Sequence, residues 1–194
     1  MTFLEINNAT KETIEAGFHR IANTLLKNYV LVVNNDYYRL IDIEFYYFAP
    51  GCFEDVYAHR HEAQLQMGKW YFHGSGIDIN FGNGKCHGGI LIRAIAKLNG
   101  EGYAGKNSIY KEIHGPLNVK TEIFSNMHSA FEREANFLYL EDVSRDPMGA
   151  GMVTPQHLVK TYWNCNVLLE TFFRRPLFDC LGGFHTGTGS GNPV

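Results

Sequence analysis

The sequence has few of the features that mark secreted, metal-binding or membrane proteins. Its 194 residues include only four Cys, with no Cys-x-x-Cys pair and no other metal-type spacing. No basic-then-apolar signal opens the chain, and no apolar run approaches the roughly 18 residues of a membrane span. These absences predict a cytoplasmic protein with reduced thiols and no membrane partner.

An excess of positive charge is also missing. The chain has 17 Lys and Arg against 20 Asp and Glu, a net charge of −3 and an isoelectric point of about 6.3. Nonspecific binding to nucleic acid depends on clustered Lys and Arg, so this balance argues against strong attraction to phosphate. A local basic patch could still contact DNA, although scattered surface charge is the alternative. The candidates for such a patch are Lys106, Lys111, Lys160 and Arg174-Arg175.

The composition is that of a folded globular protein, with 45% apolar and 19% charged residues. A chain of this length can build one substantial core, and no internal repeat or linker divides it. We therefore expect a single domain over 1–194 with a flexible Gly-rich tail at 182–194. The 14 Phe and 11 Tyr are more aromatics than such a core needs. Stacking on a planar ligand is one use for the surplus, and tight core packing is the other.

Helical and strand-like periodicities occur in the same chain and predict an α+β fold. The segment 159–173 fits either a strand or a helix, and the polar stretch 49–66 is expected to be a loop with a short helix. The expected elements are a helix that follows the caps Asn8 and Thr10, strands over 29–33, 37–47, 70–72, 77–81 and 89–95, a helix over 117–124, and a strand over 137–140.

Alternation along 37–47 predicts one apolar and one polar side of that strand. The apolar side would carry Ile41, Ile43 and Phe45, and the polar side Asp42, Glu44 and Tyr46.

Glu44 and Arg93 are each a charge within an apolar strand. Burial of a charge is costly unless the group is paired or takes part in chemistry. Arg93 is the one charged residue in the segment Gly89–Ile95. The two opposite charges therefore suggest one shared site. A structural buried ion pair is the alternative.

Four segments form a recognisable series. They are residues 17–27 (GFHRIANTLLK) followed by VLV at 30–32, residues 41–46 (IDIEFY), residues 55–59 (DVYAH), and residues 90–94 (ILIRA) with Gly115-Pro116 beyond them. In this order they resemble the alkyladenine (methylpurine, 3-methyladenine) DNA glycosylase family, as a divergent member. The similarity runs, with gaps, over about 17–123. It implies one curved, mostly antiparallel sheet, a partly open barrel, flanked by helices.

The resemblance implies a hydrolase of base-excision DNA repair that cleaves an N-glycosidic bond. Cleavage builds positive charge on the sugar, and a carboxylate both stabilises that charge and deprotonates a water. Glu44 takes that catalytic role, and Arg93 orients the water and keeps Glu44 ionised. No lysine stands beside Glu44 in the motif, so the resemblance implies a monofunctional enzyme without strand-nicking activity.

The resemblance also implies a set of base-binding residues for a base flipped from a DNA duplex or held in a single strand. Tyr46 and His59 would stack on the base, with Trp70 as a third face. Asn80 would discriminate bases by their edges. His73 stands where the family has the tyrosine that wedges into the emptied stack. The alternatives are core packing for Tyr46 and Trp70, an exposed loop position for His59, and a backbone-bonded strand position for Asn80.

Departures from the family pattern leave the substrate open. His73 has less apolar surface than a tyrosine wedge, the loop between Tyr46 and His59 is longer, and segment 61–67 lacks the family's Arg and Asn. A hydrolase of small nucleoside or nucleotide N-glycosides is therefore an alternative. A non-catalytic nucleotide-binding module is a third possibility. We expect a monomer in each case.

Residues His59-Arg60-His61-Glu62 also suggest a metal site. Two His at i and i+2 can bind one ion only when other ligands come from elsewhere, and neither His-Glu-x-x-His nor Pro-Cys-x-x-Cys is present. The sequence therefore predicts no metal and no cofactor.

Overall fold

The computed structural model describes residues 2–99 and 109–144. They fall within one compact unit, Met1–Trp163. The segment 159–173, the predicted tail at 182–194 and three of the basic candidates lie outside the described residues. These three candidates are Lys106, Lys160 and Arg174-Arg175.

The main N-terminal helix α1 (Lys11–Asn28) follows a short 3-10 helix, η1 (Thr2–Leu4), and begins where the cap residues predict. Thr10 is the N-cap: its Oγ1 accepts a hydrogen bond from the Thr13 backbone at 3.3 Å, and Thr13 Oγ1 accepts one from the Thr10 backbone at 3.0 Å. This reciprocal pair satisfies two helix-end donors. The apolar side of α1 is buried against β1 and β2, with Ile14, Phe18, Ile21 and Leu25 at its centre.

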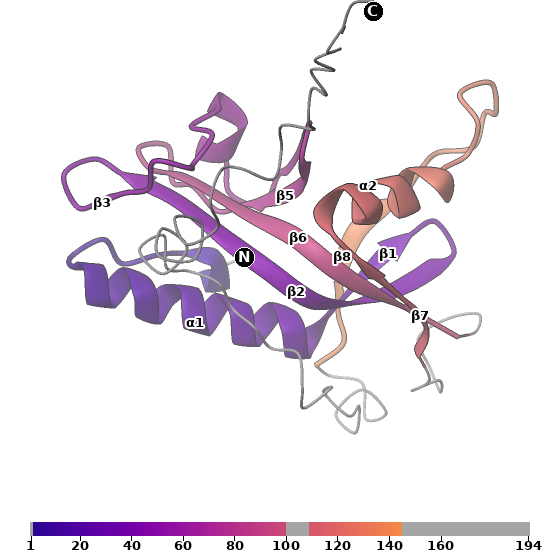
Figure 1. Ribbon diagram of the computed structural model, residues 1–194, viewed down its shortest axis with the longest axis horizontal. Helices are drawn as coiled ribbons and strands as arrows, with labels where there is room; N and C mark the ends of the chain where they lie inside the picture. The colour runs from indigo at the N-terminus through magenta and orange to yellow at the C-terminus, as the bar shows by residue number, and fades with distance from the viewer. Residues whose placement is uncertain (1, 100–108, 145–194) are drawn as a thin grey trace, which may run out of the picture. The chain divides into compact units, whose positions relative to one another are not determined.

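Eight strands of the described residues form one antiparallel sheet (Figure 1). Their order is β4-β5-β6-β2-β1-β8, with β3 paired to β2 and β7 paired to β6. The strands are β1 (Tyr29–Val33), β2 (Asp36–Ala49), β3 (Phe53–Glu54), β4 (Trp70–His73), β5 (Gly76–Asn80), β6 (His87–Leu98), β7 (Ile109–His114) and β8 (Leu138–Asp142).

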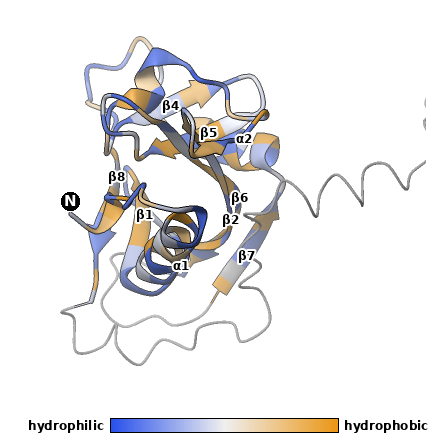
Figure 2. Ribbon diagram, turned by 90° about the vertical axis from the view of Figure 1, so that its left-hand side faces the viewer, coloured by the Kyte–Doolittle hydropathy of each residue, from blue (hydrophilic) through white to orange (hydrophobic). Residues whose placement is uncertain are grey.

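The sheet curls into a half-barrel, as expected for the predicted α+β fold. Figure 2 shows α1 within this curve, between β1 and β2. The two outer strands of the order, β4 and β8, are tied together where Trp70 Nε1 donates to the Leu138 carbonyl at 3.1 Å. The predicted curved, mostly antiparallel sheet is therefore confirmed.

A second α-helix, α2 (Pro116–Ser125), lies against β5, β6 and β7. Its buried side chains are Val119 and Ile123, and its start at Pro116 fits the preference for proline in a first helical turn. The loop after β3 contains a short 3-10 helix, η2 (Glu62–Leu65). Both agree with the sequence prediction. Within the described residues, no helix is long and apolar enough to cross a membrane.

Much of the aromatic surplus packs in the core between α1 and the sheet. Phe18 stacks on Phe45 with ring centroids 4.9 Å apart, and Tyr47 stacks on Phe81 at 5.3 Å. Phe18 also meets Phe81 edge-on at 6.0 Å. Offset and edge-on contacts of this kind are the favoured arrangements of aromatic rings. Core packing therefore accounts for these four rings.

The predicted alternation along β2 breaks at a local irregularity. Leu40 pairs with Ile95 and Ile43 with Ile92, and the register shifts on both sides of Asp42. Leu40 and Ile43 both join the main core, whereas Ile41 packs in a small separate cluster. The prediction that Ile41 packs with Ile43 is therefore wrong. A β-bulge changes which residues face the core, and a prediction based on strict alternation of residues does not account for a bulge.

Candidate functional site

The register of three strands brings acidic residues to one face of the sheet. Glu44 of β2 pairs with Leu91 of β6, and Leu91 pairs on its other side with Asp78 of β5. Residues paired directly across antiparallel strands share a face, so Glu44 and Asp78 flank Leu91. This is the face opposite to the one where Ile43 and Phe45 enter the main core. The next row across the same strands is Tyr46, Gly89 and Asn80.

Gly89 leaves room on this face for two side chains. A Cβ at this position would lie 2.6 Å from Asp78 Oδ2 and 2.6 Å from Gln64 Nε2. These distances are too short for real contacts, so any side chain here would displace both groups. The absence of a side chain lets Gln64 of η2 reach over the sheet to Asp78.

Glu44 and Arg93 form the shared site that their positions predict. Arg93 Nη1 donates to Glu44 Oε2 at 3.0 Å, and Arg93 Nε lies 3.6 Å from Asp42 Oδ2. Glu44 is 8% exposed, whereas the Arg93 side chain is 34% exposed. The arrangement is a largely buried carboxylate beside a guanidinium that reaches solvent. Asp42 also contacts Arg93. The alternation along 37–47 predicts Asp42 on the polar side of the strand but gives it no part in the site.

Tyr46 lies close to Glu44, and the two groups interact electrostatically. Burial raises the pKa of the Tyr46 phenol, and the negative charge of Glu44 raises it further. Tyr46 is therefore neutral near pH 7, and its phenol lies beside the carboxylate. The charge-assisted hydrogen bond from Arg93 restrains the Glu44 carboxylate.

His73 and Asp78 form a second polar pair on the same side. His73 Nε2 lies 3.0 Å from Asp78 Oδ1, and Gln64 Nε2 donates to Asp78 Oδ2 at 3.1 Å. The two side chains of the pair are only 8% and 2% exposed. The exposed His59 completes the group, with its ring centroid 4.6 Å from that of His73. The charge of Asp78 also contributes to the raised pKa of Tyr46, so the pair lies near the Glu44 group.

A short stack of rings extends from this pair. Tyr71 stacks on His73 with centroids 5.2 Å apart, and His61 stacks on Tyr71 at 4.8 Å. His59 meets Tyr71 edge-on at 6.1 Å. The loop before β4 therefore lies over the strand, and His59, His61 and His73 gather around Tyr71.

Asn80 shares the face with Tyr46, but its amide donor is already used. The residue is fully buried, and its Nδ2 donates to the Ala63 carbonyl of η2 at 2.8 Å. Its Oδ1 is buried and has no hydrogen-bond partner in the segments described. Asn80 thus fixes η2 on the sheet, and its Oδ1 is enclosed by protein.

Trp70 is the one candidate that the structure does not bring to this group. It pairs with Ile79, whose side chain belongs to the main core, and it packs against that core itself. Its indole N–H is used by the Leu138 carbonyl of β8. The structure therefore places Trp70 in the junction of the sheet edges rather than beside Glu44.

Three residues of the site were missed by the sequence analysis. Asp78 follows the rule that selected Glu44, because it is a charge between Ile77 and Ile79 in a strand, so its signal was present. Gln64 and Tyr71 have no comparable signal, because their role depends on how the loop folds over β4 and β5.

Comparisons with protein-family models, curated proteins and solved structures found no match for this chain. Its function is therefore inferred from the geometry of the site and from the resemblance of its motifs.

Proposed function

We propose that the chain hydrolyses the N-glycosidic bond of a modified base in DNA. The observation that carries this proposal is the largely buried Glu44 carboxylate, held by Arg93 at 3.0 Å and close to Tyr46. Departure of a base leaves positive charge on the sugar, and a fixed carboxylate stabilises that charge. The same carboxylate takes the proton of the attacking water as general base.

Arg93 and Tyr46 divide the work of positioning. Arg93 contacts both Glu44 and Asp42, and its partly exposed guanidinium can orient a water beside the carboxylate. Tyr46 adds a neutral phenol next to Glu44. A general base must lie within hydrogen-bond reach of its water, and a restrained carboxylate meets that condition more often than a mobile one.

The neighbouring rings and amide suit capture of a flipped base. Extrusion of a base from the stack costs a few kcal/mol, which stacking and hydrogen bonding must offset. The exposed ring of His59 offers a face for stacking, and Tyr46 lies on the same side of the sheet. Asn80 lies in the same row as Tyr46, and a local movement would let its buried Oδ1 accept from a base edge.

One observation favours the alternative of a small nucleoside or nucleotide substrate. His73 occupies the wedge position of the resemblance, yet its side chain is 8% exposed and bonded to Asp78 at 3.0 Å. To insert into a DNA stack, it would have to leave that buried pair. The net charge of −3 also weakens attraction to a phosphate backbone.

A base-release assay tests the proposal. Duplex and single-stranded oligonucleotides that carry hypoxanthine, ethenoadenine or alkylated purines are incubated with wild type and Glu44→Gln, then treated with hot alkali. We expect strand cleavage with wild type and none with Glu44→Gln, although the variant keeps its fold by circular dichroism. Release of base from free nucleosides alone would support the small-substrate alternative. Binding without any turnover would support a non-catalytic module.

A further inference from the structure

We infer that His59, His73 and Asp78 form a binding site for a divalent transition-metal ion of the zinc type. This goes beyond the proposed function, because hydrolysis at Glu44 needs no ion at this position. Each residue offers one ligand atom, and these three atoms lie within 4.8 Å of one another. The set unites the loop that contains His59 with β4 and β5, so residues distant in the sequence converge on one point.

The distance between the two buried ligand groups, His73 and Asp78, fits a shared ion. His73 Nε2 and Asp78 Oδ1 are 3.0 Å apart. Two ligands that bind one Zn²⁺ at about 2.0–2.1 Å, with angles of about 90–110°, lie about 2.9–3.4 Å from each other. His59 is exposed and can rotate toward them. The third ligand therefore needs only a side-chain movement.

A hydrogen bond orients the Asp78 carboxylate, as is usual for metal ligands. Gln64 donates to Oδ2 at 3.1 Å, which leaves Oδ1 directed at His73. Such outer hydrogen bonds orient the ligands of metal sites. Asp78 is 1% exposed, and within the described ranges His73 is the one basic group at ion-pair distance from it. A buried carboxylate requires a compensating charge, which a divalent ion supplies.

The ligand types select the class of ion. Two imidazoles and one carboxylate suit Zn²⁺ and Fe²⁺, whereas Ca²⁺ and Mg²⁺ prefer all-oxygen sites. Three protein ligands also leave a coordination position open, as in catalytic rather than structural zinc sites. Asp78 lies on the same face of the sheet as Glu44, across Leu91.

Calorimetric titration of the full chain without an affinity tag tests the site. The protein is first treated with a chelator and then titrated with Zn²⁺, with Mg²⁺ as the comparison ion. We expect one Zn²⁺ per chain, no Mg²⁺ binding, and at least a tenfold loss of Zn²⁺ affinity in His59→Ala. His59 is exposed, so this variant should fold even where His73→Ala or Asp78→Asn does not. Titration with Co²⁺ would add the absorption bands of a site with nitrogen and oxygen ligands.

The matched control is His114→Ala. His114 Nε2 lies 2.9 Å from Glu112 Oε2 on the surface, so it resembles the His73–Asp78 pair in distance but not in burial. We expect its affinity for Zn²⁺ to equal that of wild type. Absence of Zn²⁺ binding by wild type, or equal affinity in wild type and His59→Ala, would overturn the inference. Both results are independent of base release, so they are distinct from failure of the proposed function.

Discussion

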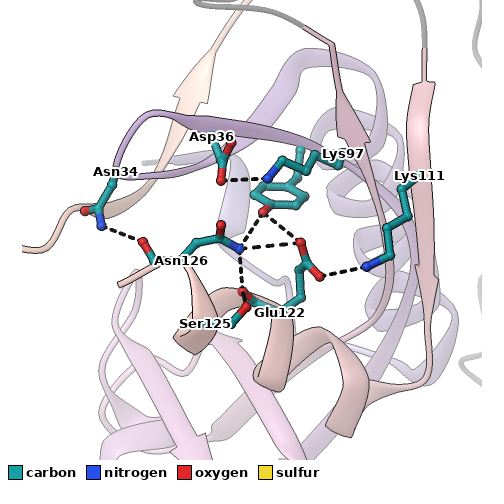
Figure 3. A network of polar contacts seen from close by, with 8 residues as sticks. Asn34, Asp36, Lys97, Lys111, Glu122, Ser125 and Asn126 are labelled. Atoms are coloured by element: carbon teal, nitrogen blue, oxygen red, sulfur yellow. Dashed lines mark hydrogen bonds and ion pairs between the residues drawn. The ribbon is translucent and has the colours of Figure 1, made fainter. Parts of the chain in front are cut away.

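Two glutamates of this protein have similar partners in different settings. Glu44 contacts Tyr46 and Arg93, and Glu122 contacts Tyr38 and Lys111. Glu122 Oε1 accepts from the Tyr38 hydroxyl at 3.2 Å, and its Oε2 accepts from Lys111 Nζ at 3.2 Å (Figure 3). Each set thus combines a carboxylate, a tyrosine and a cation.

The two sets differ in what they connect. Tyr38, Lys111 and Glu122 come from β2, β7 and α2, so their contacts hold separate elements together. Asn126 extends the group: its Nδ2 donates to the Tyr38 hydroxyl at 3.1 Å, and its carbonyl accepts from Asn34 at 2.7 Å (Figure 3).

Glu44 lies instead on β2, with Tyr46 on the same strand and Arg93 on β6, and backbone pairing already joins these strands. Its side-chain contacts add no new connection between elements. This difference favours a role in chemistry for Glu44 over a role in joining elements of the fold.

The largest expected effect is on catalysis, and it should separate the two glutamates. Glu44→Gln removes the general base and the negative charge under the sugar, and we expect base release to fall by about 10²- to 10⁴-fold. Glu122→Gln should leave the rate within about twofold, because Glu122 touches no part of the proposed site. Single-turnover base release from the best substrate measures both. Equal losses in the two variants would remove the distinction drawn between them.

Stability should show the opposite order. Glu122→Ala removes the acceptor of the buried Tyr38 hydroxyl, and a buried donor left unsatisfied costs about 1–3 kcal/mol. Glu44→Gln keeps the size of the side chain and one oxygen that can accept from Arg93, so its unfolding free energy should change less than that of Glu122→Ala. Urea denaturation of both variants measures the difference. A larger loss in Glu44→Gln would mean that the Glu44–Arg93 pair is a structural ion pair.

The fold was predictable where local chemistry decides it. The Thr10 cap predicts where α1 begins, and the β-rich run Tyr29–Val33 matches β1. The strand β7 (Ile109–His114) was not predicted, because Lys111 and Glu112 interrupt any apolar pattern and β7 depends on pairing with β6. Pairing of this kind is set by distant residues that a local pattern does not contain.

The site was predictable to the extent that buried charge is costly. That rule selected Glu44 and Arg93, and the structure places them 3.0 Å apart. It could not place Trp70, because an indole near a strand end fits either a binding face or a sheet junction. The contact of Gln64 with Asp78 depends on the fold of a loop and on the bare backbone of Gly89, neither of which has a periodic signal.

Tyr46 and Tyr38 allow the comparison of the Glu44 and Glu122 groups to be repeated with a smaller change. Tyr46→Phe removes the phenol O–H that lies beside Glu44 and keeps the ring, and we expect base release to fall by up to about tenfold, the equivalent of one hydrogen bond of about 1.4 kcal/mol. Tyr38→Phe is its matched control: it should lower the unfolding free energy and leave the rate unchanged. Rate and urea measurements on the same preparations decide. An unchanged rate in Tyr46→Phe would show that Arg93 alone orients Glu44.

The smallest expected effect concerns His87, the first residue of β6. Unlike Glu44 and Glu122, His87 has a buried polar atom without a partner in the described segments. Its Nδ1 has no hydrogen-bond partner among the residues described, and burial lowers its pKa below the ordinary value of 6.5, with the positive charge of Arg60 as a further cause. The unfolded chain therefore binds a proton at a higher pH than the folded chain does. The His87 contribution to stability is fully present above pH 6.5 and declines as the pH falls below it.

In His87→Gln this part of the decline should disappear, so the urea midpoint should fall less between about pH 7.5 and pH 5.5 than in wild type. All other residues are the same in the two proteins, so the difference between the two slopes isolates His87. Identical slopes would indicate that its ring is solvated, and the contrast between partnered and unpartnered buried groups would then not extend to this strand end.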